Sequence, residues 1–199
     1  LPFLTQFMLG LSALMREWGW LMLLMIAAGS TSLVVALRNE DFRLKFDSAW
    51  LGVPLIGRLS RGYNAARFAG TLAMLAGSGV PILKALQAAA ETLSNRAMRA
   101  DALDALVQVR EGAPLASALA AKKRFPGLLA MFARLGEQTG QLPVMLQRAA
   151  TQLSTEVQRK ALAIATVLEP LLIVVMGLMV MLIVMSVMLP IMQMNTWVK

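Results

Sequence analysis

The stretch of this sequence closest to a chemical motif is AGSGVPILK, which occupies residues 76–84. Glycine-rich loops followed by a lysine can cradle phosphate groups, because their backbone amides converge at the start of a helix. That chemistry needs a strand before the loop and a lysine directly after the last glycine. Here the preceding segment reads as a helix, Lys84 lies one turn inside the next helix, and Pro81 removes one amide. We therefore interpret the stretch as a corner between two helices.

Catalytic chemistry has few side chains to draw on in this chain. The sequence contains no histidine and no cysteine, so the usual general base, the commonest metal ligand and any thiolate are missing. Carboxylates, lysines, hydroxyls and the single tyrosine, Tyr63, remain. We predict a protein that is not an enzyme and that uses no cofactor or metal.

Two carboxylates stand where a contact could form. Glu137 lies in the sequence LGEQTG, in a predicted turn flanked by Gly136 and Gly140. Its carboxylate could accept amide hydrogen bonds or cap the next helix, or it could contact a partner, contact a subunit or bind an ion. Glu169 precedes Pro170, which bars a helical hydrogen bond and favours a kink. We expect a hinge with Glu169 paired to a basic neighbour, or a subunit contact there.

Methionines are frequent in the last apolar run, and Met185 and Met188 share one helical face. Thioethers can bind copper(I), but methionine also packs adaptably against a neighbouring helix. We favour packing, and expect this face to lie at a contact between copies of the chain in a homo-oligomer.

The elements that position these residues are unusually apolar. Apolar side chains make up 58% of the chain and charged ones 15%, against about 45–50% and 25% in typical soluble proteins. Residues 18–37 carry no charge, and neither do residues 170–198. Since about 20 apolar residues in a helix cross a bilayer, we predict transmembrane helices at residues 18–37 and 167–193.

Basic residues are concentrated between the two predicted spans. Of the 19 Lys and Arg residues, 17 lie between Arg38 and Lys160, and the formal net charge is +8. An excess of positive charge marks the cytoplasmic side of a membrane protein. A nucleic-acid surface is the alternative, but here the basic residues are spread out with acids between them. We predict a cytoplasmic middle segment that is attracted to anionic membrane lipid and binds no nucleic acid.

Glycine and proline divide the middle segment, because glycine suits the residue after a helix and proline its first turn. These helix corners are Gly79, Pro81, Gly112, Pro114, Pro126 and Pro143. They predict six helices, at about residues 58–76, 81–93, 96–111, 114–122, 126–135 and from 143 onward. Asn95 is the predicted N-cap of the third helix, whose apolar face includes Met98, Ala102 and Leu106. The sixth helix is expected to continue into the second span.

The predicted fold is therefore an all-α membrane protein, with a cytoplasmic six-helix bundle flanked by two transmembrane helices. We expect six parts along the chain. They are an outer-face, periplasmic interfacial segment (1–17), a span (18–37), a juxtamembrane elbow on the inner surface (38–57), the bundle (58–166), a span (167–193) and a periplasmic tail (194–199).

Four stretches resemble one known family, in the same order along the chain. They are LAGSGVPILKAL around Gly79, REGAPLASAL (110–119), FPGLLAMFARLGEQTGQL (125–142) and LEPLLIVVMG (168–177). Together they resemble the F domain of type II secretion systems, found in inner-membrane platform proteins of type II secretion and type IV pilus machines. The two ends of the chain look more like the secretion branch. Such proteins normally carry two F domains and three spans, so the resemblance implies that this is the second copy.

The resemblance implies a non-enzymatic platform in the bacterial inner membrane. Such a platform couples a cytoplasmic assembly ATPase to pseudopilus assembly and protein secretion. The implied partners are that ATPase, other inner-membrane platform subunits, pseudopilins, membrane lipid and further copies of the chain. A type IV pilus platform is the closest alternative. A small transport or channel component is an alternative of another class, but it should carry ionisable residues within its spans. A membrane enzyme is the least favoured alternative.

Overall fold

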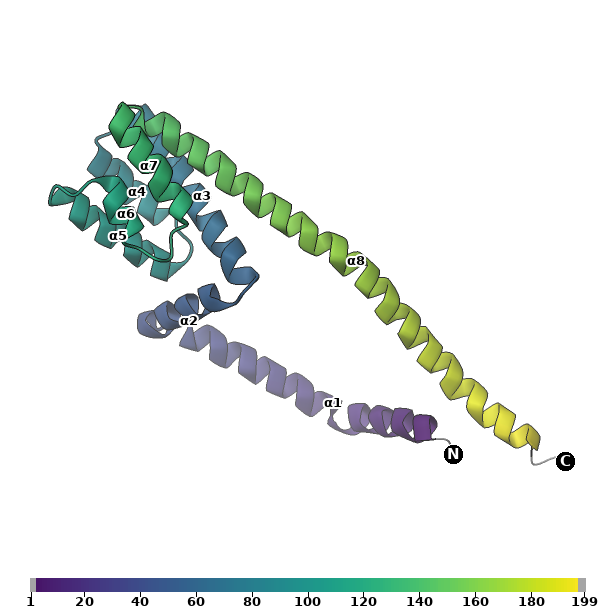
Figure 1. Ribbon diagram of the computed structural model, residues 1–199. Helices are drawn as coiled ribbons and strands as arrows, with labels where there is room; N and C mark the ends of the chain where they lie inside the picture. The colour runs from purple at the N-terminus through teal and green to yellow at the C-terminus, as the bar shows by residue number, and fades with distance from the viewer. Residues whose placement is uncertain (1–2, 197–199) are drawn as a thin grey trace. The chain divides into compact units, whose positions relative to one another are not determined.

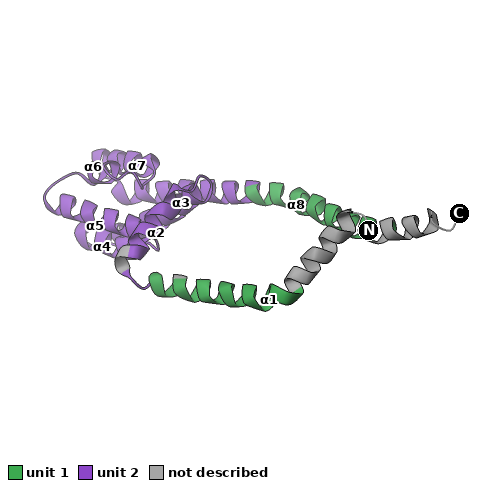
Figure 2. Ribbon diagram, turned by 90° about the horizontal axis from the view of Figure 1, so that it is seen from below, with its two compact units in different colours: residues 1–37, 164–199 green, residues 38–163 purple. Residues whose placement is uncertain are grey.

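The computed structural model describes the backbone of residues 3–196 and, within that range, the side chains of residues 16–32, 34–39, 42–186 and 188. All regular secondary structure in this part of the chain is helical, as the sequence predicts (Figure 1). The helices are α1 (Phe3–Ala36), α2 (Glu40–Gly52), α3 (Ile56–Gly77), α4 (Ile82–Glu91), α5 (Arg96–Arg110), α6 (Leu115–Ala120), α7 (Gly127–Thr139) and α8 (Leu142–Thr196). The chain divides into two units, residues 38–163 and residues 1–37 with 164–199 (Figure 2).

The unit formed by residues 38–163, called the bundle below, contains α2–α7 and the first part of α8. Its core is one cluster of apolar side chains. The largest fully buried side chains come from α3 to α8 and are Phe68, Leu72, Leu86, Met98, Leu119, Leu129 and Leu146. Each such burial contributes about 1.5–3 kcal/mol. The ring of Phe68 lies 5.2 Å from that of Phe125, which ties α3 to the loop before α7.

Small residues let the helices of the bundle approach closely. On α3, Ala65, Ala69 and Ala73 are buried at intervals of four residues, so they form one face of that helix. Ala85 and Ala89 do the same on α4, which packs against α3. The predicted apolar face of α5 is confirmed, since Met98, Ala102 and Leu106 are all buried.

Local backbone chemistry explains where the helices end. Gly79, Gly112 and Gly140 have φ angles of 81°, 100° and 68°, a left-handed region in which glycine avoids a steric penalty. Pro81, Pro114 and Pro126 each precede the first residue of a helix, and Pro143 lies in the first turn of α8. The predicted N-cap is also confirmed, because the Asn95 side chain accepts a 3.0 Å hydrogen bond from the Met98 amide.

Helix α7 is longer than predicted, and this corrects the position of Glu137. The sequence predicts an end near residue 135, but α7 continues to Thr139, so Glu137 lies in its last turn and not in a loop. Gly136 suggested the earlier stop. It is instead a buried helical glycine, at which an added Cβ would stand 2.7 Å from the Leu142 Cα. Its role is close packing against the start of α8, and Gly140 ends the helix.

Helix α2 lies within the segment predicted as a juxtamembrane elbow. It contacts α3 and α5, and its Leu51 is buried in the core of the bundle. Its other face carries Phe46 and Trp50, whose stacked rings are 6.1 Å apart, and Trp50 is 44% exposed. The segment thus folds with the bundle, and its place on a membrane surface stays a prediction.

The second unit consists of the apolar parts of α1 and α8. The most apolar 18-residue window of Arg16–Ala36 has a mean hydropathy of 1.8, and that of Leu142–Ser186 has a mean hydropathy of 2.7. By length and composition both helices could cross a membrane, since about 20 helical residues span the ~30 Å hydrocarbon core. Helix α1 is continuous across the predicted boundary between residues 17 and 18. Helix α8 runs unbroken from the bundle to Thr196, which confirms the predicted continuity. Residues 197–199 of the predicted tail and residues 1–2 lie outside the described range.

Candidate functional site

The carboxylate of Glu137 is used within the bundle. Its Oε1 accepts a 2.6 Å hydrogen bond from the Leu115 amide, and its Oε2 accepts one of 3.3 Å from the Ala116 amide. These amides belong to the first turn of α6, where backbone donors lack helical partners. The side chain therefore caps α6, an earlier helix in the chain, and not the helix that follows it. A contact of Glu137 or Gly140 with a partner or subunit stays a prediction.

A polar cluster around the buried Asn64, which was not predicted from the sequence, joins α3 to the α4–α5 loop. Asn64 is 3% exposed, and its Oδ1 accepts hydrogen bonds from the Ser94 amide at 3.0 Å and the Ser94 hydroxyl at 2.9 Å. Its Nδ2 donates to the carbonyl of Ser60 at 2.9 Å. The only sequence signal is a polar residue on the apolar, alanine-rich face of a helix.

A second cluster fastens α2 to the same loop. The Asp47 side chain accepts a 2.8 Å hydrogen bond from the Arg96 amide, and its carbonyl accepts one of 3.1 Å from Asn95 Nδ2. The start of α5 is thus held both by its own N-cap and by α2. These contacts join residues almost fifty positions apart, so sequence spacing gave no indication of them.

Ion pairs attach the loop before α7 to α5. The Arg124 guanidinium donates to both oxygens of Asp101 at 2.9 and 3.0 Å, and to the Ser48 hydroxyl at 3.2 Å. Lys122 pairs with Asp104, and that hydrogen bond and charge lower the pKa of the Asp104 carboxyl. Because Asp104 is exposed, we regard its contribution to stability as small.

The other predicted site residues lie on α8, in the second unit. Glu169 is exposed, and among the described residues it makes no ion pair with the basic neighbour that the sequence led us to expect. Helix α8 continues through Pro170. Met185 is 45% exposed and Met188 56% exposed. Their roles as subunit contacts stay predictions.

Neither a metal-binding carboxylate cluster nor a phosphate loop of the strand–loop–helix type occurs among the described residues. Within them, no group of three or more acidic residues is placed to hold a metal ion. The loop at Gly79 connects helix α3 to helix α4, so the strand that a phosphate loop requires is replaced by a helix.

Comparison with known proteins decides the family. The family model described as "Type II secretion system (T2SS), protein F" matches residues 68–190, more than half of the chain. The chain belongs to the type II secretion system protein F family. The matched range contains Gly79, Glu137, Glu169, Met185 and Met188, and the resemblance in the four quoted stretches is confirmed.

Relatives in this family align along nearly the whole chain. The chain is 40% identical to "Type II secretion system protein F" of Aeromonas hydrophila over 199 residues, which cover 100% of the chain and 51% of that protein. It is 37% identical to the protein of the same name from Pseudomonas aeruginosa, covering 98% of the chain and 48% of that protein. "Type IV pilus assembly protein PilC" of Myxococcus xanthus is 33% identical, over 89% of the chain and 42% of its own length. The chain thus spans about half the length of these relatives.

Proposed function

We propose that this chain is part of an inner-membrane platform protein of a type II secretion system. In this role it couples a cytoplasmic assembly ATPase to pseudopilus assembly and protein secretion, and it performs no catalysis itself. The observation that carries the proposal is the match of the F family model to residues 68–190, which run from α3 of the bundle into the apolar part of α8. Relatives named as type II secretion proteins are 35–40% identical to the chain.

The proposed topology places the bundle, residues 38–163, in the cytoplasm and both ends of the chain on the periplasmic side. Its support is the charge distribution, since 17 of the 19 Lys and Arg residues fall between Arg38 and Lys160. The hydropathy of α1 and α8 supports two membrane crossings. This topology exposes the bundle to a cytoplasmic ATPase.

The proposed platform is a homo-oligomer, whose subunits meet along α8. Met185 and Met188 offer an adaptable apolar face, and Glu169 with Pro170 lies nearer the bundle on the same helix. Glu137 and Gly140, at the corner between α7 and α8, remain candidates for contact with partner subunits, although the Glu137 carboxylate also caps α6. Other platform subunits and pseudopilins are the further partners that we propose.

A platform for type IV pilus assembly is the second candidate function. It is supported by the 33% identity to the pilus assembly proteins of Myxococcus xanthus and Thermus thermophilus. The secretion branch is favoured because the relatives with the higher identities, 40% and 37%, carry secretion names.

The experiment that tests the function removes the coding region for residues 1–199 from the host and restores the whole gene on a plasmid. We expect extracellular proteins to accumulate in the periplasm of the deletion strain, and to return to the medium on complementation. Pili and surface motility are scored in the same strains. Normal secretion with lost pili would favour the pilus alternative, and normal behaviour in both assays would refute a platform role.

A further inference from the structure

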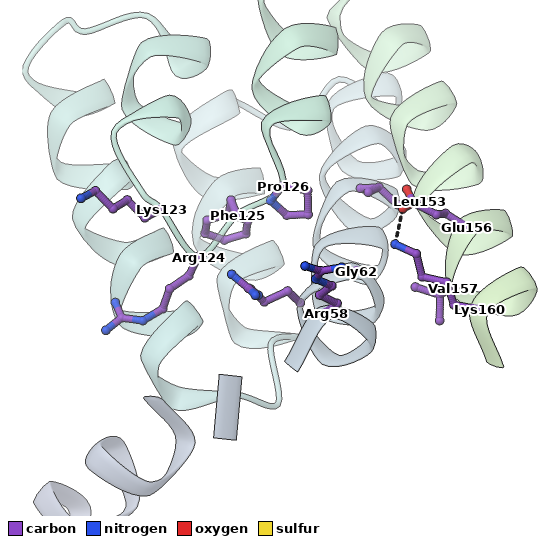
Figure 3. Close-up of a pocket in the computed structure, with 11 residues that line it drawn as sticks. Arg58, Gly62, Lys123, Arg124, Phe125, Pro126, Leu153, Glu156, Val157 and Lys160 are labelled. Carbon is purple, nitrogen blue, oxygen red and sulfur yellow. Dashed lines mark hydrogen bonds and ion pairs between the residues drawn. The ribbon is translucent and has the colours of Figure 1, made fainter. Parts of the chain in front are cut away.

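A small pocket in the bundle lies between α3, the loop before α7 and the part of α8 that belongs to the bundle (Figure 3). Its volume is about 270 Å³. Five of its eleven lining residues are cationic, namely Arg58, Arg61, Lys123, Arg124 and Lys160. The only acidic residue in the lining is Glu156. Of these six charged residues, only Arg124 also takes part in the contacts that attach the loop before α7 to α5 and α2.

Buried apolar residues form part of the pocket wall. Phe125 is 6% exposed and Leu153 is 2% exposed. Gly62 is also buried, and a Cβ there would stand 2.7 Å from Val157 Cγ2, so α3 and α8 approach closely at this point. An apolar wall lowers the local dielectric constant, because it displaces water that would otherwise screen the charges. Electrostatic interactions beside it are therefore stronger.

The cations of the pocket are only partly neutralised. Lys160 pairs with Glu156 one turn earlier on α8, and Arg124 pairs with Asp101 on α5. In the part of the chain whose side chains are described, Arg58, Arg61 and Lys123 form no ion pair. Figure 3 shows the Arg58 side chain extending from α3 toward the segment of Phe125 and Pro126. The Arg61 Nε donates to the Gly57 carbonyl at 3.3 Å, which leaves its two terminal nitrogen atoms available.

We propose that this pocket binds a phosphate group, supplied by the headgroup of an anionic lipid or by a soluble phosphate. The planar fork of a guanidinium matches two phosphate oxygens, and both Arg58 and Arg61 belong to α3, three residues apart on one helical face. Pockets for drug-sized ligands run from about 300 to 1,000 Å³. At about 270 Å³ this pocket suits a headgroup-sized anion.

The two sources of phosphate rest on different premises. Lys160 is the last cation of α8 before its apolar part, which begins a few residues later. Basic residues next to a membrane span attract anionic headgroups. The lipid source therefore rests on the proposed membrane location of the chain, whereas the soluble source is independent of it.

The test compares two double variants that each remove two positive charges. Arg58→Gln with Arg61→Gln changes the pocket. Arg99→Gln with Arg159→Gln is the matched control, because both arginines are exposed and lie outside the pocket, and Arg159 is adjacent to Lys160. The purified 199-residue chain, in neutral detergent, is titrated with phosphatidylglycerol in mixed micelles and, separately, with inorganic phosphate. Native mass spectrometry counts bound lipid, and phosphorus NMR reports bound phosphate.

We expect the pocket variant to bind at least one probe about tenfold more weakly than the control variant, since it loses charge-assisted hydrogen bonds. A loss for lipid alone assigns the pocket to a headgroup, and a loss for inorganic phosphate assigns it to a soluble anion. If both variants lose the same affinity for the probes, binding depends on the general surface charge and the proposal is wrong. If neither variant loses affinity, the proposal is wrong as well.

Membrane insertion is measured separately, by fractionation of cells that express the chain. If the chain does not insert into the membrane, the proposed function and the lipid as source of the phosphate are both wrong. The binding of inorganic phosphate would be unaffected by that result. Circular dichroism checks that both double variants keep the wild-type helical content. Because Arg58 is exposed and Arg61 is half-buried, we expect both to fold normally.

Discussion

Glu137 holds the start of α6 through Leu115, whose amide donates a 2.6 Å hydrogen bond to the Glu137 carboxylate. The residue before this helix is Pro114, which has no side-chain acceptor and makes no capping hydrogen bond. A carboxylate from α7 therefore does what a serine or aspartate N-cap does elsewhere. It also ties two consecutive helices of the bundle together.

Substituting Glu137→Ala should loosen the first turn of α6. Loss of an N-cap typically costs about 0.5–2 kcal/mol. We expect the amides of Leu115 and Ala116 to exchange with deuterium several-fold faster, as measured by hydrogen exchange and mass spectrometry of the chain in detergent. Gln138→Ala is the matched control, because Gln138 is the next residue and is exposed. Unchanged exchange at Leu115 in Glu137→Ala would contradict the capping role.

Gly136 and Gly127 provide a paired test of packing at α7. A Cβ at Gly136 would meet the Leu142 Cα at 2.7 Å, whereas nothing lies within 4 Å of a Cβ at Gly127. We expect Gly136→Ala to destabilise the bundle by about 1–3 kcal/mol through overpacking. Gly127→Ala should be neutral or stabilising by up to about 1 kcal/mol. Pulse proteolysis with trypsin across a urea series measures both, and equal stability of the two variants would show that the corner adjusts freely.

Replacing Asn64 by leucine should be more damaging than removing one of its partners. Asn64→Leu removes the acceptor of both the Ser94 amide and the Ser94 hydroxyl, and also the donor to the Ser60 carbonyl, a loss of about 1–3 kcal/mol. Ser94→Ala removes only the hydroxyl hydrogen bond and should cost about 0.5–1.5 kcal/mol. Urea unfolding of the two variants under the same conditions gives the comparison. A smaller effect for Asn64→Leu than for Ser94→Ala would show that water replaces the lost acceptor.

The proposed topology predicts labelling from opposite sides of the membrane. Ser117 is exposed on α6 of the bundle, and Ser12 lies in the segment predicted to be periplasmic. Since the chain has no native cysteine, Ser117→Cys and Ser12→Cys each introduce a single thiol. An impermeant maleimide added to cells with a permeabilised outer membrane should label only the Ser12 variant. Equal labelling of both variants before lysis would reject the topology.

Larger side chains at Met185 and Met188 test whether this face of α8 forms a subunit contact. Met185→Trp with Met188→Trp should weaken self-association of the chain in membranes, because tryptophan disrupts close helix packing at a subunit contact. The matched control is Met179→Trp with Ile183→Trp, which places the same bulk on the opposite, equally exposed face of α8. Crosslinked multimers in native membranes report the outcome. If only the control pair lowers their yield, the contact lies on the other face.

Sequence alone determined the features that depend on near neighbours. The corners at Gly79, Gly112 and Gly140 follow from backbone geometry within a few residues, and the N-cap Asn95 bonds to a residue three positions away. The buried face of α5 follows from helical periodicity. Long uncharged runs likewise identified the apolar parts of α1 and α8 before any tertiary contact was known.

Tertiary structure decided everything that joins distant parts of the chain. The carboxylate of Glu137 meets an amide 22 positions earlier, Asn64 meets Ser94 30 positions later, and the pocket gathers cations from three separate segments. No local rule specifies which helix a side chain faces, because that choice depends on how the whole core packs. The end of α7 shows the same limit. A glycine can stop a helix or permit close packing, and only the position of Leu142 distinguishes the two roles for Gly136.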